Sequence, residues 1–464
     1  MMNIRKLQNK LSNYYYKENN LFIKYSLGNI KTKKYLRRIL ELNKTVYKFL
    51  NSKEILALFN TGNEGFDNRK KELLDRYIRY KRVESNPEIV IKRNEIFKKI
   101  KNTLYTLDGE TISESKLREK INKKDEKQEK YNKVWEKLKE NQRLVIKLIK
   151  DRNKCAKKEG FKNYYNLYLY RQGLENFKKC DVQNFKRKIF YKVNERNKIK
   201  KNYIKSKEYI ENKLEKDNAK EKLFKLLEKV NVKINKKKII EIDHGENPSF
   251  SWNFCLPKNI PNDVVIYLHK NKSVYDYYYS VFHEYGHAIH YSSIKCKNFI
   301  YKILPDFYNE SMAFLFDRFL YLNDTLDFLF ESSKVKESMK NLSIPDNELA
   351  IANNFNQFLF EKSVYELGNK IDSNKIQKFK KKLSKDNLNY EKKYYSWCNS
   401  LMHTSLYPFH NLNYILAKKY VDRVISKVID KIGKYSTKRS FNYIIKNYLT
   451  RSNKNKFKYR FWEI

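Results

Sequence analysis

Apolar residues recur at helical spacing along most of the chain. One segment shows the three- to four-residue spacing of an amphipathic helix face: Trp135, Leu138, Val145, Leu148 and Ile149. Glycine (10 residues) and proline (7 residues) are scarce among the 464 residues, and no stretch rich in Pro, Gly and Ser marks a flexible linker. The pattern predicts a compact, mainly α-helical protein.

The helical pattern is interrupted after about residue 240, where turn residues surround two short apolar runs. These runs, Phe250 to Leu256 and Val264 to Leu268, have the length and bounding residues of β-strands. The helical pattern resumes near Val274. We therefore predict one small β-sheet within a mainly α-helical fold.

The same interruption divides the chain. Residues 1–240 carry long Lys- and Glu-rich amphipathic segments and few candidate catalytic groups, which predicts an N-terminal helical lobe. Inside it, Asp108-Gly109 predicts a turn between two helical segments, and Gly160 predicts the end of the helix that contains Ile149. Residues 241–464 contain all seven histidines, so we predict that this part is the catalytic, zinc-binding region.

The second part contains His283-Glu284-Tyr-Gly-His287, which is the HExxH pattern. On a helix, residues four apart lie on one face and about 6 Å apart along the axis. Two imidazoles at that spacing can bind one zinc ion. Glu284 is turned about 100° from His283, so it flanks the ion without having to ligate it. Because zinc lowers the pKa of a coordinated water from about 15.7 toward 7, Glu284 can serve as the general base.

Two later residues are candidates for a third ligand. His290 lies about 10.5 Å beyond His283 along the helix axis, whereas ligands of one tetrahedral zinc ion lie about 3 Å apart. We therefore expect His290 to pack near the site without binding the metal. Glu310 lies early in a second apolar-periodic segment, and a helix–loop–helix would return it to the metal. A first-turn glutamate that stabilises a helix N-terminus is the alternative role.

Three motifs carry a resemblance to a known family. They are Phe254-Cys-Leu-Pro257, the stretch from Phe282 to His290, and Asn309-Glu-Ser-Met-Ala-Phe314. They resemble motifs of the thimet oligopeptidase/oligoendopeptidase F family of zinc peptidases, with a more distant likeness to peptidyl-dipeptidase A. Residues Arg152 to Tyr165 also resemble the family's N-terminal helical half. The likeness is specific over about residues 250–320 and diffuse elsewhere.

The resemblance implies both an architecture and an activity. The architecture would be two mainly helical lobes around a deep substrate channel, with the small sheet beside the zinc site. The activity would be hydrolysis of short peptides. By the same resemblance His283, His287 and Glu310 are the zinc ligands, and Glu284 is the base.

A late segment offers donors for the oxyanion that forms during amide hydrolysis. Residues His403 to Tyr414 resemble the family's C-terminal element, His-x4-Pro-Phe-x4-Tyr, which contacts the substrate carbonyl. The resemblance implies that His403 and Tyr414 stabilise the oxyanion. At His410 and Asn411 the family usually carries tyrosines, so this chain departs from the pattern. Aromatic packing in the core is the alternative role for Tyr414.

The charge balance raises a different class of partner. The chain has 100 Lys and Arg against 53 Asp and Glu, a formal net charge of +47 at pH 7. Such an excess is typical of proteins that bind nucleic acids or anionic membranes. The basic residues are spread over the whole chain, without zinc-finger spacing, an RNP-like motif or a phosphate-binding glycine loop. We therefore expect a solvated basic surface with no specific nucleic-acid partner.

Location is predicted from what the sequence lacks. The first residues contain no apolar run of signal-peptide length, and no run of about 18 apolar residues predicts a membrane span. The five cysteines are far apart, odd in number and without a CxxC pair. A disulfide framework or an all-thiolate zinc site is not expected. These features predict a cytoplasmic protein.

The sequence thus predicts a zinc-dependent oligoendopeptidase, with Zn²⁺ as cofactor and peptides as substrates. An exo-acting relative, a carboxypeptidase or dipeptidyl carboxypeptidase, stays open, and it would need a carboxylate-binding cation in a cleft closed beyond the cleavage point. A basic nucleic-acid-binding protein with an inert zinc site is the alternative from another class. The intact HExxH pattern together with Glu310 argues against it.

Overall fold

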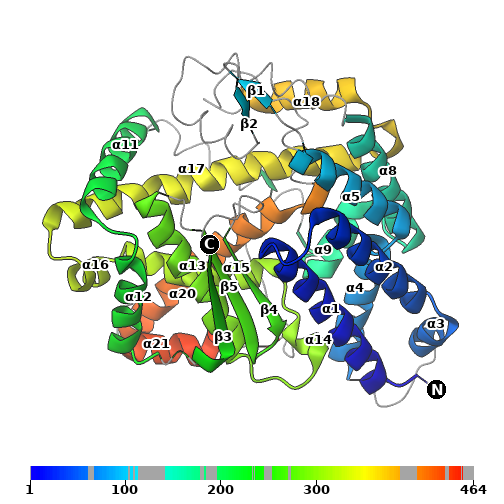
Figure 1. Ribbon diagram of the computed structural model, residues 1–464, viewed down its shortest axis with the longest axis horizontal. Helices are drawn as coiled ribbons and strands as arrows, with labels where there is room; N and C mark the ends of the chain where they lie inside the picture. Colours follow the sequence, from blue (N-terminus) through cyan, green and yellow to red (C-terminus); the bar gives the residue numbers. More distant parts are fainter. Residues whose placement is uncertain are drawn as a thin grey trace.

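A computed structural model gives a mainly α-helical fold with a small three-stranded sheet (Figure 1). The predicted fold class is thereby confirmed. The structure describes residues 2–60, 67–102, 105–107, 110–112, 142–177, 182–183, 196–232, 234, 236–244, 253–269, 273–386, 405–433, 438–450 and 452.

The N-terminal helices gather on one side of the molecule, drawn in blue to cyan in Figure 1. They are α1 (Ile4–Ser26), α2 (Thr32–Leu50), α3 (Lys53–Asn60), α4 (Asn68–Glu84), α5 (Pro87–Asn102), α8 (Gln142–Lys158) and α9 (Tyr164–Gln172). Helix α8 buries the predicted stripe that includes Leu148 and Ile149. Gly160 follows its end with φ +88°, which glycine adopts without strain. Trp135 and Leu138 lie outside the described residues.

A β-hairpin corrects one prediction in this region. Strands β1 (Tyr105–Leu107) and β2 (Glu110–Ile112) pair antiparallel, with Tyr105 opposite Ile112. The segments that directly flank Asp108-Gly109 are therefore strands, and the prediction of flanking helices was wrong. Asp-Gly between alternating residues is typical of a two-residue hairpin turn, which explains the difference. Residues 108 and 109 lie outside the described residues.

The three-stranded sheet contains the two predicted strands and one more. β4 (Phe254–Asn259) and β5 (Asp263–His269) pair antiparallel, and β3 (Ile239–His244) pairs parallel with β5, so the order is β3-β5-β4. The central run of β5 is buried, as a continuous apolar strand requires. Residues 250–252 of the first predicted run lie outside the described residues.

Three helices of the second half pack in a row beside this sheet: the first contacts β4 and β5, and the second lies between the first and the third. They are α13 (Val274–Ser293), α15 (Asp306–Asp317) and α20 (His410–Ile432). The long helix α17 (Ser333–Glu366) crosses the molecule beside them (Figure 1). The other helical elements are α11 (Arg196–Lys213), α12 (Asn218–Lys229), η4 (Lys236–Lys238), α14 (Phe299–Lys302), η5 (Arg318–Leu320), α16 (Asn323–Leu329), η6 (Gly368–Lys370), α18 (Ser373–Asp386), α21 (Lys438–Ile444) and the π-helical turn η7 (Ile445–Leu449).

The main apolar core continues across residue 240. It joins side chains of α8 and α9 to those of α13, α15, α17 and α20. A second cluster packs α1 and α4 against α14. The division into a lobe of residues 1–240 and a catalytic region of residues 241–464 stays a prediction.

A buried arginine of the N-terminal half also connects the two halves. The Arg152 guanidinium on α8 donates to both carboxylate oxygens of Glu84 on α4, at 2.9 and 3.0 Å. The same guanidinium donates to the hydroxyl of Tyr365 on α17 at 3.1 Å and to the carbonyl of Ser405 at 2.7 Å. Arg152 therefore fixes the chain just before α20, the helix that carries Tyr414.

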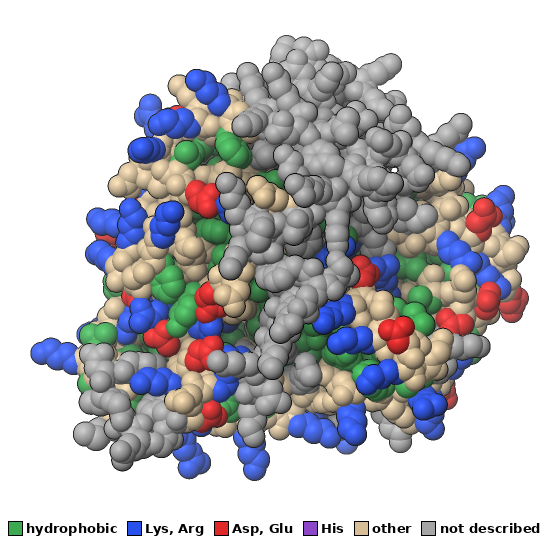
Figure 2. Space-filling view, turned by 180° about the vertical axis from the view of Figure 1, so that it is seen from behind, with side chains coloured by type: hydrophobic (Ala, Val, Ile, Leu, Met, Phe, Trp, Pro, Cys, Tyr) green, Lys and Arg blue, Asp and Glu red, His purple; other side chains and the backbone are tan. Residues whose placement is uncertain are grey.

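Charged side chains are dispersed on the face shown in Figure 2. Among the described residues there, Lys and Arg side chains lie along the left, lower and right edges of the view, with Asp and Glu between them. This view agrees with a solvated basic surface, although the absence of a nucleic-acid partner stays a prediction. In the described part of the chain, no helix has the length and apolar character needed to cross a membrane.

Candidate metal centre and active site

Helix α13 presents two imidazoles on one face. Its start is fixed by Ser273, whose side chain accepts a hydrogen bond from the backbone N–H of Asp276. Tyr278 and Phe282 are fully buried and anchor the helix in the core. His283 and His287 follow one turn apart, with their ring centroids 4.9 Å apart.

Helix α15 returns Glu310 to the same place, as the predicted helix–loop–helix requires. Oε2 of Glu310 lies 3.6 Å from Nε2 of His283 and 3.7 Å from Nε2 of His287. The ligand atoms of the three residues all lie within 4.8 Å of one another. The structure thus brings together the three residues that were predicted as metal ligands.

The close contact between α13 and α15 depends on a glycine inside the HExxH motif. A Cβ placed on Gly286 would lie 2.8 Å from Cα and 3.1 Å from the carbonyl oxygen of Ala313. Real Cβ atoms do not approach backbone atoms so closely. Gly286 and Ala313 are within one helical turn of His287 and Glu310, so this contact sets the distance between the ligands.

Burial and neighbouring charges shift the pKa of each member of the cluster. Burial alone lowers the pKa of His283, but the Asp317 carboxylate outweighs it and the pKa lies well above its usual value. Burial lowers the pKa of His287 to about 3. For Glu310, burial raises the pKa, but the two imidazoles outweigh it and the pKa falls to about 2. Glu310 is therefore ionised and His287 neutral, the forms that bind a metal, whereas His283 would release the proton on Nε2 when a metal binds.

Asp317 is a functional candidate that the sequence prediction missed. Its Oδ2 lies 3.0 Å from Nδ1 of His283. A carboxylate on that nitrogen fixes the tautomer with Nε2 free, and it orients Nε2 toward Glu310. Asp317 follows Glu310 by seven residues on the same helix, so an i, i+7 search from the ligand would have found it.

Glu284 is buried beside the two histidines, with 6% of its surface exposed. Its charge helps to raise the pKa of two neighbours, the Cys255 thiol on β4 and the Tyr414 hydroxyl on α20, in addition to the effect of their burial. Glu284 therefore lies between the sheet and α20. It has the position expected of a base beside the metal cluster.

Tyr414 extends from the first turns of α20 toward the same cluster. Its hydroxyl lies 2.8 Å from Nε2 of His410, and its ring lies 5.9 Å from that of Phe314, which in turn contacts His283. Burial raises the pKa of Tyr414 well above its usual value, and the Glu310 and Glu284 carboxylates raise it further. The hydroxyl therefore stays protonated and can donate a hydrogen bond.

The start of α20 is held rigidly. Phe409 has φ +62°, an uncommon conformation for a residue with a side chain. Its buried ring lies 5.1 to 5.2 Å from the rings of Tyr165, Tyr168 and Tyr365. The hydroxyl of Tyr168 also donates to Oδ1 of Asn413 at 2.8 Å. These contacts fix the direction in which Tyr414 points.

The remaining predicted residues fall into two groups. His403 lies outside the described residues. His290 is fully buried, and its Nδ1 lies 2.9 Å from the carbonyl oxygen of Leu449. It is absent from the cluster of ligand atoms found among the described residues. Its contact is the packing role that the helix geometry predicted.

The cluster meets the requirements of a metal site. Two imidazoles and one carboxylate are a typical protein donor set of catalytic zinc sites. Ligands about 2.0–2.1 Å from an ion at tetrahedral angles are about 3.4 Å apart, close to the 3.6 and 3.7 Å found here. Oε2 of Glu310 is buried and makes no hydrogen bond to a described residue. A cation would satisfy that oxygen, so the residues fit a divalent metal ion.

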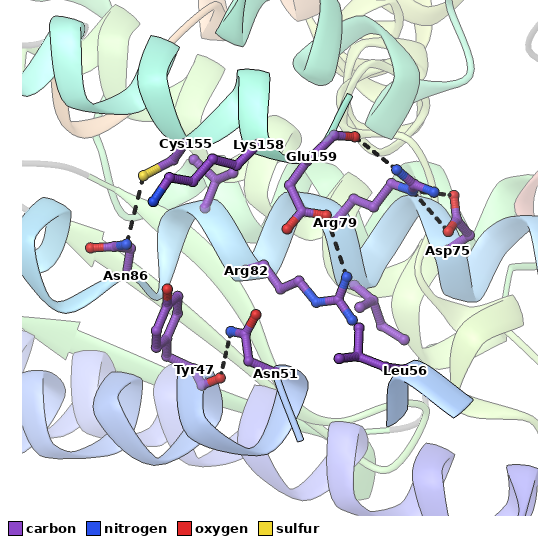
Figure 3. Close-up of a pocket in the computed structure, with 12 residues that line it drawn as sticks. Tyr47, Asn51, Leu56, Asp75, Arg79, Arg82, Asn86, Cys155, Lys158 and Glu159 are labelled. Atoms are coloured by element: carbon purple, nitrogen blue, oxygen red, sulfur yellow. Dashed lines mark hydrogen bonds and ion pairs between the residues drawn. The ribbon is translucent and has the colours of Figure 1, made fainter. Parts of the chain in front are cut away.

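A cavity of about 430 Å³ lies between α2, α4 and α8 (Figure 3). Its two arginines are already paired. Arg79 donates to Asp75 at 2.9 Å, and Arg82 lies 3.4 Å from a carboxylate oxygen of Glu159. No residue of the metal cluster lines this cavity, so it is separate from the candidate active site.

Comparison with known proteins places the fold. The sequence matches no family model and no curated protein. The structure of PZ peptidase A with an inhibitor matches with a TM-score of 0.66 and 14% identity, over 98% of this chain and 89% of that chain. A structure described as an oligoendopeptidase F from Bacillus anthracis matches with a TM-score of 0.64 and 15% identity, over 97% of this chain and 85% of that chain. Metallocarboxypeptidase 1 of Trypanosoma cruzi matches with a TM-score of 0.61 and 13% identity, over 97% of this chain and 93% of that chain.

The matches extend over nearly the whole chain in both directions, including the N-terminal helices where the sequence likeness was diffuse. The chain therefore has the fold shared by PZ peptidase A, oligoendopeptidase F and the metallocarboxypeptidase, which is the likeness that its motifs predict.

Proposed function

We propose that this protein is a zinc-dependent peptidase that hydrolyses short peptides. The observation that carries the proposal is the cluster of His283, His287 and Glu310, whose ligand atoms lie within 4.8 Å of one another next to the buried Glu284. The fold shared with several peptidases supports the same reaction class.

Each residue of the site has a separate role in the proposed hydrolysis. A bound zinc ion would polarise the peptide carbonyl and lower the pKa of water. Glu284 accepts the proton of the attacking water and returns it to the leaving amine. Tyr414 donates its hydroxyl proton in a hydrogen bond to the carbonyl oxygen as negative charge develops there. Asp317 holds the His283 ring, and His410 holds the Tyr414 hydroxyl.

The cleavage position has two candidate modes. The endopeptidase mode is supported by the motifs and by the match to the oligoendopeptidase F structure. The match to a metallocarboxypeptidase at a similar TM-score supports an exo-acting mode. Both modes use the same residues at the cluster. They differ only in how the C-terminal side of the peptide is held.

We also propose a cytoplasmic location. In the described part of the chain, Cys155, Cys255 and Cys296 are free thiols. Disulfides persist in oxidising compartments and are rare in the cytoplasm, so the free thiols support this location.

Mass spectrometry of a mixed-peptide digest tests the proposal. The purified protein should cut short peptides, should lose activity with a zinc chelator, and should recover it when zinc is added back. The product masses also give the cleavage position and the upper limit of peptide length. A zinc-loaded protein that cuts none of the peptides would contradict the proposed function.

A further inference from the structure

A second cavity, of about 260 Å³, lies where the N-terminal helices meet the catalytic segments. We refer to it as the Arg93 cavity. Side chains of α1, α2, α5, β4 and the segment before α20 line it, among them Phe22, Tyr35, Arg93, Phe97, Leu256 and Tyr407. The walls of this cavity therefore come from both parts of the chain, and no residue of the metal cluster is among them.

One wall of the cavity reaches the segment that carries Tyr414. The ring of Tyr407 lies 6.4 Å from that of His410, which contacts Tyr414. Leu256 faces the cavity from β4, on the side of the sheet opposite to its neighbour Cys255, because successive side chains of a strand point to opposite faces. The Tyr407 wall is therefore the part of the cavity nearest to the residues that approach the metal cluster.

Arg93 is the cationic group of the cavity, and most of its donors are available. Its side chain is 20% exposed, and its Nη1 donates to Oε2 of Glu84 over 3.2 Å. Glu84 already receives two shorter bonds from Arg152. Among the described residues, Glu84 is the hydrogen-bond partner found for Arg93, whereas a guanidinium carries five N–H donors.

The charges around Arg93 are not balanced. Arg93 and Arg152 share the one carboxylate of Glu84, and Lys81 pairs with Glu18 at 2.5 Å. These five groups carry one positive charge more than they carry negative charges, and Arg93 is the cation among them that lines the cavity.

Glu18, Asn19 and Asn94 also line the cavity, and Glu18 is paired with Lys81 at 2.5 Å. The remaining wall is aromatic and aliphatic. The ring of Phe22 packs edge-on against that of Phe254 at 5.4 Å, and Tyr35 stacks on Tyr25 at 4.5 Å. Phe97 lies against the same pair. Such a wall favours an apolar side chain, and Arg93 beside it favours an anion.

Resting on the proposed function, we propose that the Arg93 cavity binds a carboxylate of the peptide substrate next to an apolar side chain. Arginine binds carboxylates through two parallel N–H···O bonds, which gives both affinity and orientation. A peptide offers this group at its C-terminus or on an acidic side chain. Binding of the C-terminus would set a fixed distance between the end of the peptide and the bond that is cut.

Arg93→Gln is the variant that tests the cavity. It removes the charge and the paired donors, while Glu84 keeps both bonds from Arg152, so the fold should be retained. Arg82→Gln is the matched control. Arg82 is also a partly buried arginine near a carboxylate, but it lines the other cavity.

Binding is measured in full-length Glu284→Gln protein, so that turnover does not consume the probe. The probes are three forms of one N-terminally fluorescent decapeptide that ends in Phe and contains one Glu: the free acid, its C-terminal amide, and the free acid with Gln in place of Glu. Loss of a charge-assisted bond should weaken binding by about tenfold to a hundredfold. Anisotropy titrations give the Kd of each form, with and without Arg93→Gln.

We expect amidation to weaken binding and Arg93→Gln to abolish the difference between acid and amide, whereas Arg82→Gln preserves it. If Arg93 instead discriminates Glu from Gln, the carboxylate bound is that of a side chain. If the ratios between the Kd values of the three peptides are the same with and without Arg93→Gln, the inference is overturned.

The hydrolysis assay keeps this inference separate from the proposed function. Chelator-sensitive cleavage without any Arg93-dependent discrimination would overturn the cavity assignment and leave the peptidase intact. Discrimination in binding by a zinc-loaded protein that cuts no peptide would support the cavity and contradict the peptidase.

Discussion

Asp317 controls the direction of the His283 ring through its contact at 3.0 Å with Nδ1. Asp317→Asn keeps an oxygen that can accept the hydrogen bond but removes the negative charge. We expect zinc affinity to fall by about 10- to 100-fold, as is typical when the partner of a metal-binding histidine is changed. Competition with a fluorescent chelator measures this affinity.

Asp422→Asn is the control for that measurement, because Asp422 pairs with Arg318 on the surface and is 44% exposed. Its substitution should leave zinc affinity unchanged. Equal zinc affinities in the parent and Asp317→Asn would show that the carboxylate does not orient the ligand.

Tyr414 is proposed to stabilise the oxyanion because its hydroxyl lies near the Glu284 and Glu310 carboxylates. Tyr414→Phe removes only the hydroxyl, so zinc binding and folding should survive. If the hydroxyl contacts the oxyanion in the transition state, kcat should fall by about 10²- to 10³-fold. Near-normal turnover with a lower thermal midpoint would assign Tyr414 to the core. His410→Ala, measured in parallel, shows whether the contact at 2.8 Å is needed to hold the hydroxyl.

At the scale of residues, the sequence predicted the candidate metal ligands but not the residues that orient the site side chains. His283 and His287 have a fixed spacing on one helix, so local geometry was enough to predict that they meet. Glu310 lies on another helix, and the resemblance of its motif to a known family was needed to bring it into the prediction. Asp317 contacts the His283 ring and His410 contacts the Tyr414 hydroxyl, and both contacts depend on the side-chain rotamers that the folded protein adopts. The spacing of seven residues from Glu310 would have selected Asp317 once Glu310 was taken as a ligand, whereas no spacing selects His410 as the partner of Tyr414.

At the scale of elements, the contact between α13 and α15 determines the geometry of the site. Gly286→Ala would place a methyl group 2.8 Å from Cα of Ala313, which is backbone and cannot rotate away. We expect the two helices to separate, with a loss of about 1–3 kcal/mol in the free energy of unfolding and weaker zinc binding. Thermal melts with and without zinc measure both effects.

Ser292→Ala tests whether any substitution on α13 has the same effect, because Ser292 lies in the last turn and is partly exposed. It should leave both the melting temperature and its increase with zinc near those of the parent. A Gly286→Ala protein with the stability and zinc affinity of the parent would show that the helices tolerate a wider separation.

The strands show where local sequence patterns become insufficient. β5 was predicted because its apolar run is continuous, as expected of a strand buried on both faces. β3 was missed because Ile240 and Ile242 alternate with Glu241 and Asp243 over only six residues. Its partner β5 lies more than twenty residues away and pairs in parallel, a distance over which turn signals carry no information.

At the scale of the whole molecule, the Arg152–Glu84 pair couples the N-terminal helices to the segment before α20. Burial alone raises the pKa of Glu84, but the charge of Arg152 outweighs it and the pKa lies below its usual value of 4.5. The pair therefore contributes stability above pH about 4.5 and loses it as the pH falls through the lower, folded-state pKa.

Glu84→Gln would leave the Arg152 guanidinium buried without its carboxylate. At pH 7 we expect the free energy of unfolding to fall by about 3–5 kcal/mol. The gap between parent and variant should narrow as the pH falls from about 4.5 through the lower folded-state pKa, because Glu84 takes up a proton in the unfolded chain before it does so in the folded protein. Denaturant titrations at several pH values measure this difference in the free energy of unfolding. A difference that does not change with pH would contradict the role given to the Glu84 carboxylate.

Glu221→Gln is the control for that pair. Glu221 forms an exposed i, i+4 pair with Lys225, and such surface pairs contribute little. Its substitution should not change stability measurably at any of these pH values.

The Arg93 cavity illustrates what the sequence could not supply. Its walls come from five segments separated by up to several hundred residues. Among 100 Lys and Arg residues, no local pattern marks Arg93. The mainly helical fold and the metal cluster follow from periodicity and spacing, whereas this cavity follows from how distant helices pack.

The central claim is that Glu284 acts as the base of a metal-dependent hydrolysis without binding the metal itself. The most direct measurement is zinc content and peptide turnover of Glu284→Gln on the same sample, beside Glu310→Ala. Glu284→Gln should retain zinc, because no ligand is lost, and should lose nearly all turnover, whereas Glu310→Ala should lose zinc as well. A fully zinc-loaded Glu284→Gln protein that still cuts peptides at close to the parent rate would contradict the account.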